Sequence, residues 1–165
     1  MVWQRSLAHT CSDPQVCSSL VAALEAFLHA DEYLLQVNVN ERTIAHRLAC
    51  LLQLEFDEYS VDCEYNRDGH DPKEIAYGSG DDDEHGSRVY PDIIVHRRGN
   101  NDSNLLVIEL KKSNNPEADD RDFEKLKSYC SQLHYLHGAF VRFRVRHDDV
   151  GIDRAEFVYP LEHYE

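Results

Sequence analysis

Basic residues are scarce in this sequence. Its 165 residues include 17 lysines and arginines against 31 aspartates and glutamates, so the formal net charge is −14. This balance excludes a protein that coats nucleic acid through an overall positive charge, because phosphate binding depends on lysine and arginine. Any surface that binds nucleic acid must therefore be a local patch on an acidic body.

Several sequence motifs of metal and nucleophile sites are absent as well. There is no CxxC pair, no HExxH and no GxSxG. Their absence argues against a zinc knuckle, a zinc protease and a hydrolase with a serine or cysteine nucleophile. The five cysteines are an odd number, and we expect reduced, mostly buried thiols of an intracellular protein. These cysteines are Cys11, Cys17, Cys50, Cys63 and Cys130.

Long apolar runs are also missing. No run approaches the roughly 18 residues of a membrane span, and the first ten residues, MVWQRSLAHT, lack the apolar core of a signal peptide. We therefore expect a cytoplasmic protein with no membrane partner. Apolar residues still make up 42% of the chain, which is enough for a core, and the length fits a single domain over residues 1–165.

Three stretches have the apolar spacing of helices. The first follows the N-cap signal Asp13-Pro14 and predicts a helix over 14–30. The second follows Asn40 and predicts a helix to about residue 54. The third begins at Asp119 or Asp120 and runs from Phe123 to His137.

The remaining apolar segments alternate as strands do. The predicted strands are 59–65, 89–96, 105–111, 139–146 and 154–159. Residues 66–88 are expected to form a polar surface loop, and 97–104 the turn of a hairpin. The resulting order, α-α-β-β-β-α-β-β, predicts an α/β domain with a mixed sheet.

The central hairpin brings charged residues together. If its turn is symmetric, paired residues sum to about 201, so Asp92 lies opposite Glu109. Lys111 lies two residues beyond Glu109 and therefore shares its face. Two opposed carboxylates repel each other, and burial adds a further penalty that a hard cation offsets. Magnesium suits such a site because it needs only one or two carboxylates and keeps several waters.

The same residues resemble a known signature. Pro91-Asp92, then sixteen intervening residues, then Glu109-Leu110-Lys111 resembles the PD-(D/E)xK motif of the restriction-endonuclease-like nuclease superfamily. The resemblance covers roughly residues 40–146. It implies a restriction-endonuclease-like αβββαβ core with a mixed central sheet, to which the helix at 14–30 would be an extra N-terminal helix.

The resemblance also implies a reaction and a set of site residues. The reaction is magnesium-dependent hydrolysis of phosphodiester bonds, with manganese as a substitute, and DNA is favoured over RNA. Asp92 and Glu109 would bind the metal with the backbone carbonyl of Leu110, and Lys111 would hold the attacking water or the transition-state charge. Glu41 matches a glutamate on the first core helix that often joins the metal site. It lies on the apolar face of that helix, although a plain first-turn helix charge explains it too.

Contact with nucleic acid must come from local positive charge. Arg142, Arg144 and Arg146 alternate along one predicted strand and so share a face. The other candidates are Arg97 and Arg98 on the hairpin turn, Lys112 after the motif, and Lys125 on the following helix. A solvated sheet edge, or ion pairs with acidic loops, is the competing interpretation of the arginines.

Two functions remain open from the sequence. One is a nuclease that acts alone, as a homodimer or with a partner protein, since the net charge predicts weak affinity for nucleic acid. The other is a non-catalytic subunit with a nuclease fold, or an interaction module, within a larger complex. The acidity favours the second, whereas the intact Asp92, Glu109 and Lys111 argue for the first.

Overall fold

Capping residues start two of the helices where the sequence predicts them. In the computed structural model, which describes residues 1–68, 70–76 and 87–161, the Asp13 carboxylate accepts the amides of Gln15 and Val16. Asn40 does the same for the amide of Thr43. The helices of the described chain are α1 (Val2–Thr10), α2 (Pro14–Ala30), α3 (Glu32–Gln36), α4 (Glu41–Glu55) and α5 (Asp120–Gln132).

The strands form one large sheet and one small ribbon. The strands are β1 (Ser60–Cys63), β2 (Glu74–Ile75), β3 (Ser87–Arg88), β4 (Ile93–His96), β5 (Leu106–Lys112), β6 (His137–Arg146) and β7 (Asp149–Phe157). The large sheet has the order β1-β4-β5-β6-β7, while β2 and β3 pair separately. Only β5 and β6 run parallel within it; its other neighbours are antiparallel. The mixed α/β fold expected from the sequence is thus observed.

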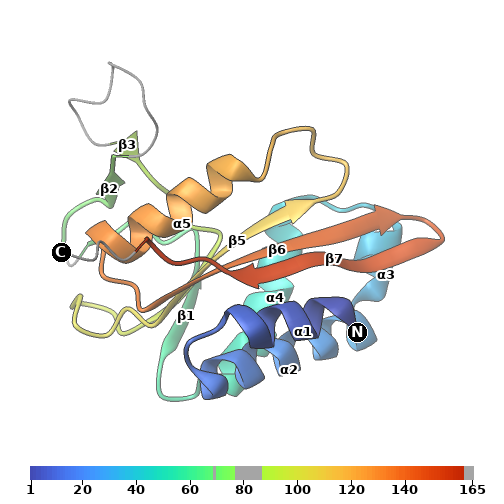
Figure 1. Ribbon diagram of the computed structural model, residues 1–165, viewed down its shortest axis with the longest axis horizontal. Coiled ribbons are helices and arrows are strands. Elements are labelled where there is room, and N and C mark those ends of the chain that lie inside the picture. Colours follow the sequence, from blue (N-terminus) through green and yellow to red (C-terminus); the bar gives the residue numbers. More distant parts are fainter. Residues whose placement is uncertain (69, 77–86, 162–165) are drawn as a thin grey trace.

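Helices cover both faces of the large sheet (Figure 1). Leu106, Ile108 and Leu110 of β5 pack into the core shared with α1, α2 and α4. The alternate residue Val107 packs into a second core with α5. Because side chains alternate along a strand, Glu109 and Lys111 also face α5. The helix α5 therefore lies directly over the charged end of the motif strand.

The hairpin register matches the prediction. Ile93 pairs with Ile108 and Ile94 with Val107, so each pair sums to 201 as expected. Asp92 directly precedes this ladder, and its carboxylate accepts the amide of Leu110 at 2.7 Å. The turn between the strands is thus symmetric enough to bring Asp92 next to β5.

Several boundaries differ from the predictions. Two helices, α1 and α3, were not expected, so three helices rather than one precede α4. The sequence predicts one helix as far as His137. In the structure α5 ends at Gln132, and His137 is the first residue of β6. The last strand is longer than predicted and starts at Asp149.

Two further expectations need correction. The loop predicted over 66–88 contains the ribbon of β2 and β3, while residues 69 and 77–86 of it lie outside the described residues. All five cysteines are free, as expected, but only Cys17 is buried, while Cys50 and Cys63 are exposed. No helix in the described ranges has the length and apolarity needed to cross a membrane.

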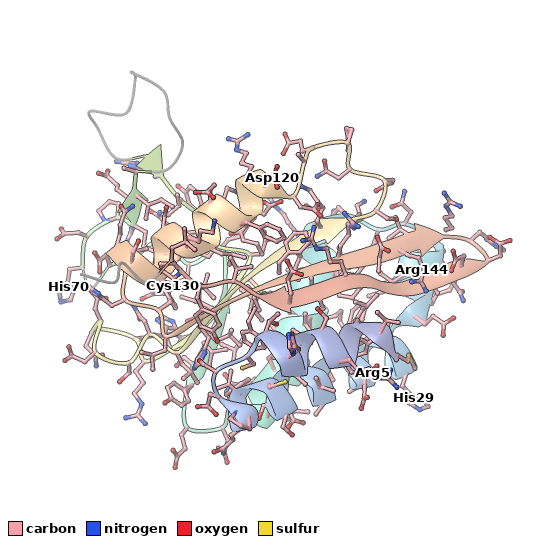
Figure 2. The ribbon with its side chains drawn as sticks, in the orientation of Figure 1. Arg5, His29, His70, Asp120, Cys130 and Arg144 are labelled. Atoms are coloured by element: carbon pink, nitrogen blue, oxygen red, sulfur yellow. The ribbon has the colours of Figure 1, made fainter. Side chains whose placement is uncertain are left out.

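A close contact explains one glycine of β7. Gly151 has φ +148°, and a Cβ there would lie 2.8 Å from Nη2 of Arg144. The Arg144 guanidinium lies across this backbone, donating to the carbonyls of Val150 and Ile152 and pairing with Asp149. Figure 2 shows Arg144 on the β6–β7 pair, far from Cys130 near the end of α5.

We expect Gly151→Ala to destabilise the protein by about 1–3 kcal/mol, because an L side chain is strained at this φ and its Cβ would displace the Arg144 guanidinium. Chemical denaturation measures the change in unfolding free energy. The variant Gly99→Ala is the control: Gly99 also has a positive φ, of +85°, but a Cβ added there would meet no heavy atom within 4 Å. A larger loss at Gly99 than at Gly151 would show that the Arg144 contact contributes nothing.

Candidate active site at the end of the hairpin

Three carboxylates from three segments meet at one end of the sheet. Asp92 precedes β4, Glu109 lies within β5, and Glu41 is the first residue of α4. Glu41 is anchored there because its Oε2 accepts the amide of Lys112 at 3.1 Å. Asp92 and Glu41 line an open depression of about 440 Å³. The first-turn position of Glu41 therefore does not leave it pointing only to solvent.

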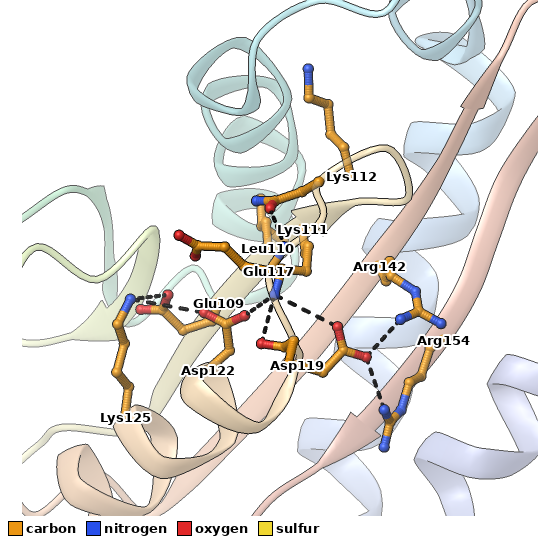
Figure 3. Close-up of polar contacts among 12 residues, drawn as sticks. Glu109, Leu110, Lys111, Lys112, Glu117, Asp119, Asp122, Lys125, Arg142 and Arg154 are labelled. Carbon is orange, nitrogen blue, oxygen red and sulfur yellow. Dashed lines mark hydrogen bonds and ion pairs between the residues drawn. The ribbon is translucent and has the colours of Figure 1, made fainter. Parts of the chain in front are cut away.

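Glu109 is enclosed by α5 (Figure 3). Its side chain is 5% exposed. Tyr129 donates its hydroxyl to Oε1 at 3.2 Å, and the Lys125 ammonium lies 3.5 Å from Oε2. These contacts orient the carboxylate without fully neutralising it, since Lys125 is also shared with Asp122.

Burial makes the two motif carboxylates hard to ionise. It raises the pKa of Asp92 to about 7, with a further rise from the charge of Glu41, although the Leu110 amide acts in the opposite direction. Burial, and next the charge of Asp92, raises the pKa of Glu109 to about 8, although Lys125 lowers it. Each carboxylate therefore ionises at the expense of the other, as expected for opposed acids in a shared site.

Lys111 is held by the first turn of α5 rather than by Glu109. Its ammonium donates to Oδ2 of Asp122 at 2.8 Å and to the carbonyl of Ala118 at 3.1 Å. Oδ1 of Asp119 lies 3.7 Å away. The lysine side chain is 4% exposed. The sequence correctly predicts that Lys111 shares a face with Glu109, but it does not predict these partners.

The expected nucleic-acid contacts are mostly engaged within the chain. Arg142 pairs with Asp119 and Asp153, and Arg144 pairs with Asp149. Within this stripe Arg142 and Arg144 are half-buried, and Arg146 is exposed. Two of the three arginines are thus ion-paired within the chain, as the competing interpretation expected, but Asp149 and Asp153 lie on β7 rather than on an acidic loop.

The other expected contacts are dispersed over the molecule. On the hairpin turn, Arg97 lies over the ring of Tyr59, and Arg98 pairs with Asp62. The Lys112 ammonium donates to Asn38 and to the carbonyl of Val39. Lys125 belongs to the carboxylate site itself. The structure therefore does not bring these cations into one patch.

Sequence reasoning missed several members of the site. Asp122 and Tyr129 lie three residues before and four residues after Lys125, which the sequence analysis does name, so all three share one face of α5. That spacing beside the apolar stripe is the signal that identifies Asp122 and Tyr129. Arg42 was also missed: it lines the depression, and its partner is Glu64 at 3.0 Å.

The raised pKa values predict an unusual pH dependence of stability. Because both carboxyls hold their protons more tightly in the folded state, their contribution is fully present below about pH 4 and is lost as the pH rises through about 7–8. In the presence of a chelator, we expect the melting temperature to fall from pH 5 to pH 8. The free energy of unfolding should decrease by a few kcal/mol over this range, since a pKa shift of one unit corresponds to about 1.4 kcal/mol.

The double variant Asp92→Asn, Glu109→Gln provides the comparison for this experiment. It removes both titrations, so its melting temperature should change less over the same range. Circular dichroism melts at the two pH values measure the difference. Parallel curves for wild type and variant would mean that the two carboxyls do not titrate as proposed.

No protein-family model matches this chain, and neither the curated proteins nor the solved structures give a significant match. Any function must therefore be inferred from the geometry of the site.

Proposed function

We propose that the chain is a divalent-metal-dependent nuclease that hydrolyses phosphodiester bonds, in DNA rather than RNA. The observation that carries the proposal is that Glu41 and Asp92, from two separate segments, line an open depression, while Glu109 of a third segment is buried close enough for the charge of Asp92 to raise its pKa. A structural ion-pair cluster would neutralise its buried carboxylates, whereas Asp92 and Glu109 retain strongly raised pKa values. Such perturbed groups are typical of functional sites.

The topology supports the same proposal. If the separate β2–β3 ribbon is left aside as an insertion between β1 and β4, the segments α4, β1, β4, β5, α5 and β6 come in the order helix, three strands, helix and strand. This is the order that the resemblance to the restriction-endonuclease-like superfamily implies. The motif residues lie at the end of its central pair, β4 and β5.

The residues present fit magnesium better than a metal that needs many protein ligands. Among the described residues, no group of three or more His, Cys, Asp or Glu side chains is arranged to hold a metal ion. Magnesium is usually bound through one or two carboxylates and keeps several waters. Asp92, Glu109 and the Leu110 carbonyl would hold it. When bound, the ion would lower the pKa of a water and polarise a phosphate oxygen.

The chain's own groups then have separate tasks. Hydrolysis forms a bond from a water oxygen to phosphorus and breaks one bridging P–O bond, and the leaving oxygen takes up a proton from solvent. We assign Glu41 to orient the water and accept its proton, because it lines the depression with Asp92. The Lys111 ammonium stabilises negative charge on the phosphate in the transition state.

Calorimetry with manganese and a cleavage assay test the metal site. The double variant Asp92→Asn, Glu109→Gln should lose both manganese binding and cleavage of plasmid DNA, because it loses the two charged ligands. Lys111→Ala should retain manganese affinity but lose about 10²-fold in turnover, as removal of one transition-state stabiliser does.

The matched control is Lys127→Ala, which removes a half-buried lysine of α5 that pairs with Glu124. It should cleave at the wild-type rate. Equal manganese binding by the wild type and the double variant would refute the metal site. Equal turnover of Lys111→Ala and Lys127→Ala would remove Lys111 from the chemistry.

Arg42 is the cation best placed to contact a phosphate at the depression. Its side chain is 81% exposed, and its pair with Glu64 is exposed too, so exchange for a phosphate costs little. Arg42→Gln should reduce the log–log slope of duplex affinity against salt by about 0.9, the value for one phosphate contact. Arg5→Gln, on α1, is the control with an unchanged slope. The measurement is fluorescence anisotropy in calcium or chelator, and equal slopes would exclude the contact.

A non-catalytic role in a larger complex remains the second candidate. The observation that favours it is the internal pairing of Arg142 and Arg144, which engages two of the cations expected to bind nucleic acid. On this alternative, the wild type cleaves no DNA or RNA, and manganese does not shift its melting temperature. On the proposed function, both responses are present.

A further inference from the structure

Asp119 occupies the N-cap position of α5 but does not cap the helix. Its side chain forms no hydrogen bond to the amides of the first turn. An aspartate at this position normally accepts such an amide and contributes about 1 kcal/mol. The Asp119 carboxylate is only 9% exposed and turns toward the sheet instead. Helix capping therefore does not explain this residue.

The partners of Asp119 come from three neighbouring strands (Figure 3). Its Oδ2 accepts from Nη1 of Arg142 at 2.7 Å and from Nη1 of Arg154 at 2.9 Å. Its Oδ1 faces the Lys111 ammonium at 3.7 Å. One carboxylate thus links β5, β6 and β7 to the first residues of α5. Three cations therefore surround this largely buried carboxylate and compensate the cost of burying it.

The lysine gains its position from the same turn. Lys111 has a long, flexible stem, and holding its ammonium in one place costs side-chain entropy. The carbonyl of Ala118 and the carboxylate of Asp122, which bind it, lie one residue before and three residues after Asp119. If the Asp119 anchor is lost, both acceptors can move together with the start of α5.

We propose that Asp119, held by Arg142 and Arg154, is a positioning residue that fixes the Lys111 ammonium for catalysis. This inference rests on the proposed nuclease function. It gives the two arginines a task within the site and removes Arg142 from the set of nucleic-acid contacts. Asp119 acts through Lys111 and touches neither the metal nor the substrate.

The chain offers close controls for this proposal. Arg142 also pairs with Asp153 at 2.7 Å, and Arg154 also pairs with Glu156 at 2.8 Å. Neither of these outer carboxylates contacts Lys111 in the described structure. Asp153→Asn and Glu156→Gln therefore each remove a partner of one of these arginines but leave the contact between Asp119 and Lys111 in place. Asp119→Asn keeps the shape of the side chain and removes its charge.

Steady-state cleavage of a DNA oligonucleotide gives the first result. We expect Asp119→Asn to lower kcat by about 10- to 100-fold, because a displacement of about 1 Å has such effects. KM and manganese affinity should be unchanged, which a general loss of structure would not produce. The two control variants should remain within about twofold of the wild-type kcat. Equal kcat values for Asp119→Asn and Asp153→Asn would overturn the proposal.

Labelling of lysines with an amine-reactive reagent gives a second result that needs no activity. Mass spectrometry should show faster modification of Lys111 in Asp119→Asn than in the wild type, with Lys127 as the internal standard. Unchanged labelling of Lys111 would also overturn the proposal. If the wild type cleaves neither DNA nor RNA, the proposed function fails, and labelling alone then decides whether Asp119 holds Lys111.

A second variant covers the case in which Asp119→Asn does not fold. The double variant Arg142→Lys, Arg154→Lys keeps both charges but loses the guanidinium forks that bind Asp119 and the outer carboxylates together. It should show the same fall in kcat at unchanged KM. Wild-type kcat in this folded variant would overturn the proposal.

Discussion

A chain of alternating charges joins α5 to the large sheet, and the site depends on it. From Glu109 it passes through Lys125, Asp122 and Lys111 to Asp119, and from there to the arginines of β6 and β7. Most of these groups are largely buried, so water cannot replace a missing partner. Removal of one charged group therefore leaves its neighbour as an uncompensated buried charge. The same contacts therefore orient the helix and hold the ammonium and carboxylate groups that the proposed reaction uses.

The central hairpin could be predicted because its determinants are local. The turn over 97–104 fixes the register, and alternation along β5 fixes which residues share a face. From these two facts alone, Asp92 was expected beside Glu109, with Lys111 on the same side. The helices α2 and α4 could also be predicted, because Asp13 and Asn40 mark where they start and the spacing of apolar residues marks their buried faces.

The elements that were missed lack such local signals. The helix α1 has no side-chain N-cap and buries only Trp3 and Leu7, and α3 has five residues and no side-chain cap. The partners of Lys111 and Glu109 come from α5, whose placement depends on packing between segments distant in sequence. Arginine spacing along β6 correctly predicted a shared face, but not that β7 and the start of α5 would bring carboxylates to it.

The net charge of −14 does not describe the potential at the site. The helices α4 and α5 both begin there, and the N-terminus of each carries partial positive charge. Glu41, Asp120 and Asp122 in their first turns are favoured by that charge. Interactions between exposed charges are screened beyond about 8 Å at physiological salt, so the distant acidic surface contributes little. On the proposed function, a phosphate at the depression would meet Arg42, the N-terminus of α4 and Asp92, which line it, and its binding would depend on the balance between Asp92 and Glu109. The pair of Asp92 and Glu109 is electrostatically unfavourable when both are ionised, because both carboxyls are buried and both have raised pKa values. A bound cation would relieve it, and this is the physical reason to expect one there.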